Sequence, residues 1–306
     1  MLWIGKDFLI IGKRLSNIAR PGLVCQRCAF ICSFQLTFGL TRRKIGQPLT
    51  KGAMKLESYK CASRRVDAAL RAAGVVVVMN RDHIKKPQDM VTTVQEVYKA
   101  GLVAEVTFRI DEGILREGMK ELRALRSASP ADKPMLLGVG SVINPKELES
   151  AIEMGFDMIV APANVMGGYG EGKEFVRICR ENGVFSAPAV FTPTELQYFI
   201  ERSDGLEPDA IKIFPARSHG PKGLADLLAP FVRERHKNRI IMPTGAVDYE
   251  TGPLYQDAIR KRGYCPVLGM SAPLALVDKE KKPGDPDCIR RALAEFKQKF
   301  NPAPIA

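Results

Sequence analysis

The sequence has few of the features that mark a membrane or a secreted protein. No apolar run approaches the roughly 18 consecutive residues needed to span a bilayer. The seven cysteines are an odd number, which does not suit a disulfide framework in a chain of 306 residues. We therefore expect no membrane partner and a reducing, cytoplasmic location.

Acidic residues are almost absent from residues 1–53, which contain Asp7 alone against nine Lys and Arg. Eight of the twelve net positive charges therefore lie in this segment, and the remaining residues are close to neutral. A nearly neutral body has no electrostatic footprint for nucleic acid, so we expect no nucleic-acid partner. A nucleic-acid-binding protein driven by the basic segment is the alternative from another class. Removing the segment would abolish such binding and leave an enzyme active.

The basic segment also lacks a complete metal site. Cys25, Cys28 and Cys32 are closely spaced, but no fourth ligand is near and the segment has no histidine, so we expect no metal. The segment is rich in arginine and poor in acids, as targeting peptides are, and Met54 is a second candidate start. We expect residues 1–53 to be a basic N-terminal extension, disordered or absent from the mature protein, and residues 54–306 to form a single domain.

From residue 74 onward, short apolar runs alternate with longer stretches of helical periodicity. Strands alternating with helices indicate βαβ units and a parallel sheet. Eight such units in about 230 residues predict a closed (β/α)8 barrel of the α/β class; a doubly wound open sheet is the alternative. Residues 61–74 are predicted to form a helix that caps the bottom of the barrel. The predicted strands are residues 75–80, 103–109, 135–141, 157–163, 184–190, 210–216, 240–246 and 265–271.

A lysine interrupts one of the apolar strands. In "AIKIFPA", Lys212 lies between Ile211 and Ile213, and strand residues two apart share a face. If the isoleucines meet the outer helices, Lys212 points into the barrel. The same period places Glu105 and Arg109 on one face of the predicted strand 103–109. Polar residues at the C-terminal ends of barrel strands are candidates for the active site.

Lysine, glutamate and arginine together suggest a 2-keto acid substrate. Burial can lower the pKa of a lysine by several units from about 10.4, which frees the amine to attack a ketone and form a Schiff base. A carboxylate can then transfer protons, and a guanidinium can bind a substrate carboxylate. These roles would fall to Lys212, Glu105 and Arg109. A buried structural ion pair between Lys212 and Glu105 is the alternative, and spacing alone does not decide between the two.

Six motifs carry a resemblance to a known family. They are "VAEVTFR", "GVGSVINP", "IVAPA", "APAVFTPTEL", "IKIFPA" and "MPTGAV", in this order. Over roughly residues 61–275, the sequence resembles the 2-keto-3-deoxy-6-phosphogluconate (KDPG) and 4-hydroxy-2-oxoglutarate (KHG) aldolases. The resemblance implies a class I aldolase of carbohydrate metabolism that cleaves a 4-hydroxy-2-keto acid to pyruvate and an aldehyde. It also implies a (β/α)8 barrel, a homotrimer, and no metal or other cofactor.

The resemblance also implies roles for individual residues. Lys212 would be the Schiff-base lysine and Glu105 the general acid and base. The implied substrate-binding residues are Arg109 and Ser141 at the pyruvyl carboxylate, Pro162 and Phe214 around the pyruvyl group, and Thr244, Gly245, Ala246 and Ser271 toward the rest of the substrate.

Three departures from the family pattern concern the far end of the substrate. Ala246 and Met270 stand where the family usually has glycine, and Asn80 stands where it often has arginine. Glycine lets backbone N–H groups approach a phosphate closely, which a side chain hinders. An aldolase for a non-phosphorylated 2-keto-3-deoxy sugar acid is therefore the alternative to one for a phosphorylated substrate.

Overall fold

The computed structural model of the chain describes residues 63–163 and 172–300, with the backbone alone for 172–174. The predicted basic extension and its three cysteines lie outside the described residues. None of the helices in the described ranges is long and apolar enough to cross a membrane.

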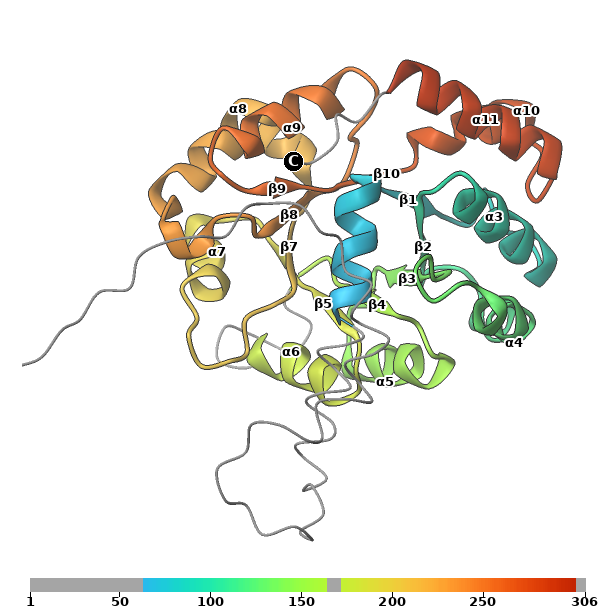
Figure 1. Cartoon of the computed structure of the whole chain (residues 1–306), viewed down its shortest axis with the longest axis horizontal. Coiled ribbons are helices and arrows are strands. Elements are labelled where there is room, and N and C mark those ends of the chain that lie inside the picture. The colour runs from blue at the N-terminus through green and yellow to red at the C-terminus, as the bar shows by residue number, and fades with distance from the viewer. Residues whose placement is uncertain (1–62, 164–171, 301–306) are drawn as a thin grey trace, which may run out of the picture. The chain divides into compact units, whose positions relative to one another are not determined.

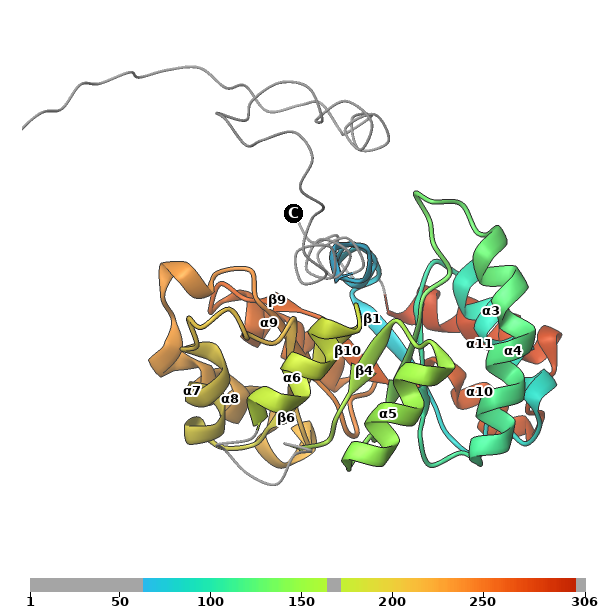
Figure 2. The ribbon, with the colours of Figure 1, turned by 90° about the horizontal axis from the view of Figure 1, so that it is seen from below.

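Parallel strands alternate with helices along the described chain (Figures 1 and 2). Each predicted strand is present, and two of them are interrupted. The strands are β1 (Val75–Met79), β2 (Val103–Thr107), β3 (Leu137–Gly140), β4 (Met158–Val160), β5 (Phe185–Ala187) followed by β6 (Ala189–Val190), β7 (Ala210–Ile213), β8 (Ile240–Pro243), and β9 (Cys265–Pro266) followed by β10 (Leu268–Met270).

The strands close into a ring. They form two runs of parallel neighbours, β10-β1-β2-β3-β4-β5 and β6-β7-β8-β9. One residue separates β5 from β6 and one separates β9 from β10, and both residues stay in the ladder: Pro188 O accepts from Lys212 N at 3.0 Å, and Val267 N donates to Ile241 O at 3.1 Å. The two runs are therefore one barrel with eight strand positions, which confirms the predicted (β/α)8 fold over the open sheet.

The helices surround this ring (Figure 1). Two of them begin with a capping side chain: Asn144 and Thr192 accept the backbone N–H three residues on, and a proline follows each. The helices are α3 (Pro87–Lys99), α4 (Glu112–Ala128), α5 (Pro145–Met154), α6 (Gly172–Glu181), α7 (Pro193–Ile200), α8 (Ala216–Leu228), α9 (Thr251–Arg260), α10 (Ala275–Glu280) and α11 (Pro286–Lys299), with 3-10 turns η1 (Ala229–Phe231), η2 (Glu234–His236) and η3 (Ala272–Leu274).

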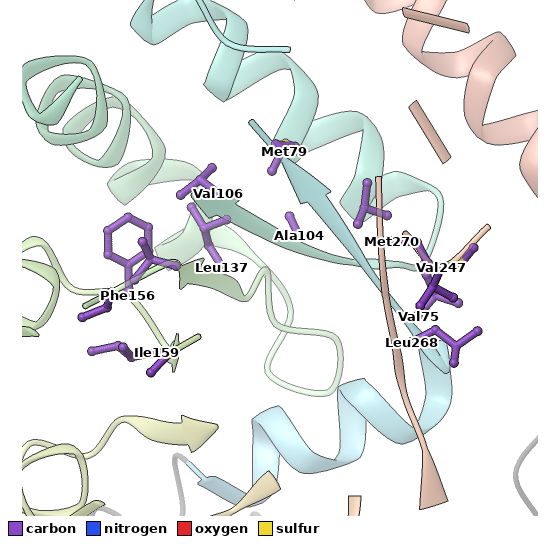
Figure 3. Packing of buried hydrophobic residues seen from close by; sticks show 14 of the residues in the cluster. Val75, Met79, Ala104, Val106, Leu137, Phe156, Ile159, Val247, Leu268 and Met270 are labelled. Atoms are coloured by element: carbon purple, nitrogen blue, oxygen red, sulfur yellow. The ribbon is translucent and has the colours of Figure 1, made fainter. Parts of the chain in front are cut away.

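The larger of two buried apolar clusters lies between the strands and the helices. Alternate residues of most strands belong to it, such as Val75 and Met79 of β1 and Ala104 and Val106 of β2 (Figure 3). Burial of apolar side chains on this scale is the main favourable term in folding. Because this outer cluster takes every second residue of those strands, the residues between them point into the barrel.

The smaller cluster fills the lower part of the barrel. Val66 and Leu70, from the helical residues 63–73, pack in it with inward side chains such as Val76, Phe185 and Met242. This confirms the helix that was predicted to cap the bottom of the barrel. With that end filled, the functional groups have room only at the C-terminal ends of the strands.

Several strands end earlier than predicted at their C-terminal ends. Strand β2 ends at Thr107 rather than at residue 109, because Ile110 N bonds to Thr107 O at 3.1 Å and turns the chain. Strand β7 ends at Ile213 rather than at residue 216, since α8 already begins at Ala216. The residues beyond these ends form the rim of the barrel mouth.

Candidate active site

Lys212 points into the barrel. Its neighbours Ile211 and Ile213 are both in the outer cluster, so the lysine between them lies on the inner face of β7. Its side chain is buried, with 4% of the residue exposed. Its amine nitrogen lies 4.8 Å from the ring centre of Phe214, the next inward residue along the chain. Lys212 therefore has the inward orientation that the sequence predicts.

Glu105 takes the corresponding place on β2. Ala104 and Val106 on either side of it belong to the outer cluster, and Glu105 is 3% exposed. Thr107, two residues on, is also buried on the inner face at the end of the strand. A carboxyl group and an amine thus enter the same barrel interior from different strands.

Burial shifts both groups toward their neutral forms. It lowers the pKa of Lys212 and raises the pKa of Glu105. The opposite charge on the partner acts against each shift and is the smaller effect. No hydrogen bond or ion pair joins the two side chains in the described part of the chain. Burial thus makes the charged form of each group less favourable than it is in water.

The inner face of β3 makes the room for Glu105. Gly138 and Gly140 are its inward residues, and a Cβ on Gly140 would lie only 2.0 Å from Glu105 Oε1. Gly269 has a similar relation to Thr244, whose Oγ1 would be 2.3 Å from an added Cβ. We did not single out these glycines from the sequence. Alternating glycines within a strand were the available signal, since they often mark close approach of another group.

Gly140→Ala is expected to lower kcat by about 10²-fold, the low end of what a positioned acid or base contributes. The added methyl group overlaps the Glu105 carboxyl and must move it. Gly138→Ala is the matched control: its methyl group would meet the flexible end of Met158, at 2.5 Å from Cε. Steady-state kinetics of the two folded variants give the comparison. Equal kcat values would contradict the assignment of Glu105 as the general acid and base.

Arg109 follows the end of β2 and lies between Phe108 and Ile110, which both belong to the outer cluster. Because β2 has already turned after Thr107, the Arg109 side chain lies at the rim and is 41% exposed. Its Nη2 donates to Ser141 O at 3.3 Å and to the carboxylate of Glu147, the third residue of α5. Arg109 therefore remains next to Ser141, as the proposed carboxylate site requires, but it already has an acidic partner.

The other predicted site residues all follow strand ends at the mouth of the barrel. Ser141 follows β3, half-buried Pro162 lies two residues past β4, and exposed Ser271 follows β10. Thr244 is buried and its backbone bridges to Gly269. The structure thus gathers the residues predicted from separate segments at one end of the barrel, because the strands are parallel.

The turn after β8 keeps an unusual backbone at the far end of the site. Gly245 and Ala246 have φ angles of 98° and 55° in succession. An alanine in the left-handed region costs roughly 1–2 kcal/mol relative to the right-handed one. The turn therefore keeps a backbone conformation that suits glycine, although residue 246 is alanine. Asn80, by contrast, uses its Oδ1 locally, accepting from Asp82 N at 2.7 Å.

Solved structures of the same fold include several aldolases. A KHG/KDPG aldolase from TTHB1 is 24% identical, with a TM-score of 0.52 over 76% of this chain and 97% of that chain. A KDPG aldolase from Zymomonas mobilis ATCC 29191 is 20% identical, with a TM-score of 0.55 over 78% of this chain and 99% of that one. At these identities the likeness shows the fold.

A third neighbour contains a trapped reaction intermediate. It is a KDPG aldolase from Legionella pneumophila with pyruvate captured at low pH as a covalent carbinolamine. It is 19% identical, with a TM-score of 0.54 over 74% of this chain and 96% of that one. Comparison with curated proteins gives no significant match.

The sequence itself matches a family model. The model is described as KDPG and KHG aldolase, and the match covers residues 66–263, from the capping helix to the residues before β9. It includes both Glu105 and Lys212. Because the match spans more than half of the chain, this protein belongs to the KDPG and KHG aldolase family.

Proposed function

We propose that this protein is a class I aldolase that cleaves a 4-hydroxy-2-keto acid to pyruvate and an aldehyde. The observation that carries the proposal is the inward, buried pair of Lys212 and Glu105, each shifted by burial toward its neutral form. A neutral amine is the form that attacks a ketone. Membership of the aldolase family supports the proposal, as does the carbinolamine in the Legionella pneumophila neighbour.

In the first half of the reaction, the Lys212 nitrogen attacks the C2 ketone and gives a carbinolamine. The Glu105 carboxylic acid then donates its proton to the carbinolamine hydroxyl, which leaves as water. The products are an iminium ion on Lys212 and a carboxylate on Glu105. The new positive charge stabilises the ionised carboxylate in a site that disfavoured it before.

In the second half, the Glu105 carboxylate removes the proton of the C4 hydroxyl. The C3–C4 bond breaks, its electron pair moves into the iminium, and the aldehyde leaves. The remaining enamine takes the proton back at C3, and water hydrolyses the resulting iminium to pyruvate and free Lys212. The scheme requires no metal or other cofactor.

The pyruvyl half and the far half of the substrate have different support. Arg109 and Ser141 would bind the carboxylate, while Pro162 and Phe214 would enclose the pyruvyl group. The left-handed backbone at Ala246 suits glycine and supports a phosphorylated substrate such as KDPG. The Cβ of alanine at the same position would hinder a phosphate and supports a non-phosphorylated sugar acid. The homotrimer and the role in carbohydrate metabolism stay predictions from the resemblance, and the cytoplasmic location stays a prediction from the composition.

Borohydride reduction in the presence of pyruvate tests the proposal. It converts an imine into a stable amine, which intact mass and peptide mapping then locate. We expect one adduct, on Lys212, and none when pyruvate is omitted. Protein that is folded by circular dichroism but forms no adduct would refute the proposal. Aldol addition of pyruvate to glyoxylate, glyceraldehyde or glyceraldehyde 3-phosphate, assayed without borohydride, would identify the far half of the substrate.

A further inference from the structure

We propose that Glu147 competes with the substrate carboxylate for Arg109 and thereby sets the affinity of the site for 2-keto acids. This inference rests on the proposed function, in which Arg109 binds that carboxylate. It concerns a residue at the start of α5, outside the barrel interior. The starting point is that the guanidinium of Arg109 forms an ion pair with the carboxylate of Glu147.

The contacts of Arg109 occupy the guanidinium nitrogen that a two-point contact with a substrate carboxylate would need. One nitrogen, Nη2, donates both to Ser141 O and to Glu147 Oε1. A guanidinium binds a carboxylate through two parallel N–H groups, either Nη1 with Nη2 or Nε with Nη2. Both pairs include Nη2. A substrate carboxylate therefore obtains a two-point contact only if Glu147 or the Ser141 carbonyl gives up its bond.

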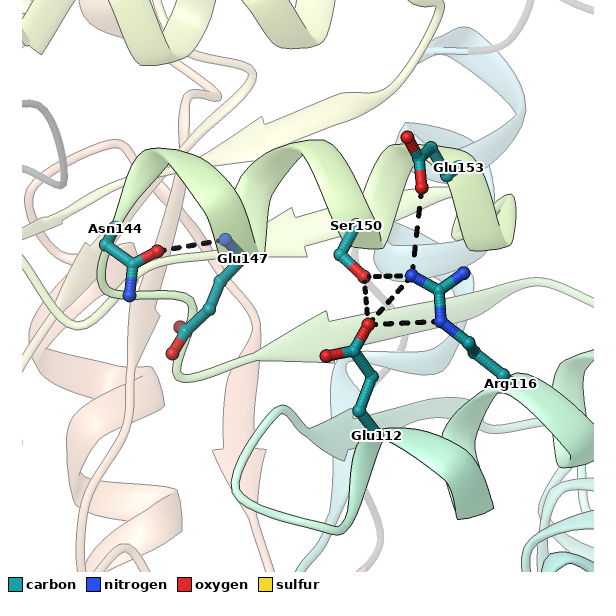
Figure 4. A network of polar contacts seen from close by, with 6 residues as sticks. All are labelled: Glu112, Arg116, Asn144, Glu147, Ser150 and Glu153. Atoms are coloured by element: carbon teal, nitrogen blue, oxygen red, sulfur yellow. Dashed lines mark hydrogen bonds and ion pairs between the residues drawn. The ribbon is translucent and has the colours of Figure 1, made fainter.

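Glu147 is held in place from the other side. Its Oε2 accepts from Ile143 N at 2.8 Å, and its own backbone N–H donates to Asn144 Oδ1 at 2.9 Å. The side chain is 15% exposed. Its carboxylate points away from the separate network of Glu112, Arg116, Ser150 and Glu153 between α4 and α5 (Figure 4). The carboxylate is thus fixed to the loop after β3 and remains beside the rim arginine.

The chain offers a matched control at the start of α7. Glu195 is also the third residue of its helix, and its Oε2 accepts from Phe191 N and Thr192 N at 2.6 and 2.7 Å. Both glutamates therefore brace a loop at the mouth. Among the described residues, Glu147 forms an ion pair with an arginine and Glu195 does not. Comparing them isolates the arginine contact from the loop and from the overall charge of the mouth.

The experiment compares the pyruvate concentration that gives half-maximal borohydride trapping in wild type, Glu147→Gln and Glu195→Gln. Glutamine can still accept the loop N–H but carries no charge to attract Arg109. We expect Glu147→Gln to lower the half-maximal concentration about 1.5- to 5-fold, the size of a partly exposed charged contact. Glu195→Gln should leave it unchanged. A gain in affinity is not what loss of a structural brace would produce.

Further results separate this inference from the proposed function. The effect of Glu147→Gln should disappear in an Arg109→Leu background, because no guanidinium remains to be released. If wild type traps pyruvate but Glu147→Gln has an unchanged or higher half-maximal concentration, the competition is wrong and the aldolase stands. If folded wild type traps no pyruvate at all, the aldolase proposal and this inference both fail.

Discussion

Lys212→Met is expected to abolish both the pyruvate adduct and aldol cleavage without destabilising the protein. The methionine side chain has a similar length but no nucleophile, so the imine cannot form. Because burial disfavours the lysine ammonium, an apolar side chain suits this site at least as well. The measurements are intact mass after borohydride reduction, cleavage assayed by pyruvate release, and thermal unfolding.

This variant also tests the alternative that Lys212 and Glu105 form a structural ion pair. Breaking such a pair by removing one partner costs about 3–5 kcal/mol. A loss of stability of that size, with the pyruvate adduct still present on another residue, would favour the structural alternative. Lys222→Met is the control, because Lys222 is an exposed lysine on the helix that follows the same strand. We expect it to leave trapping, cleavage and unfolding as in wild type.

Glu105→Gln is expected to lower kcat by about 10²–10⁴-fold, the usual contribution of a positioned general acid or base. Pyruvate should still be trapped on Lys212, more slowly, because the nucleophile is intact and only proton transfer is impaired. The variant should fold normally, since burial raises the pKa of Glu105 and glutamine introduces no charge into the same buried place. Cleavage kinetics and the time course of trapping are the two readouts.

A second buried glutamate serves as the control for this prediction. Glu96 of α3 is 5% exposed and pairs with Lys99 at 2.7 Å on the outside of the barrel. Glu96→Gln removes a buried carboxylate without touching the interior, so we expect an unchanged kcat. If Glu105→Gln retained a kcat similar to that of Glu96→Gln, another group would have to transfer the C4 proton.

The strand pattern was readable from the sequence because each barrel strand is short, apolar and separated from the next by a periodic helix. The orientation of Lys212 followed from the two-residue period between Ile211 and Ile213. The ends of the strands were less readable. Apolar and proline-containing residues 214–216 continue past β7, and the structure shows that the strand ends at Ile213 and that α8 begins at Ala216.

The partner of Arg109 shows where local periodicity stops being informative. Counting by twos from Glu105 places Arg109 on the inner side, and the turn after Thr107 leaves it at the rim of the mouth. Its partner Glu147 lies 38 residues further along the chain. No sequence pattern within β2 indicates that contact, because it depends on how α5 follows β3.

By itself, the sequence determined the alternation of parallel strands and helices, the capping helix and the inward amine and carboxyl group, because these depend on periodicities within single segments. Only the tertiary structure decided the closure of the ring through Pro188 and Val267, the space that Gly140 leaves for Glu105, and the pairing of Arg109 with Glu147. Those features depend on which segments become neighbours. Short-range patterns do not encode distances between residues that meet only when the barrel closes.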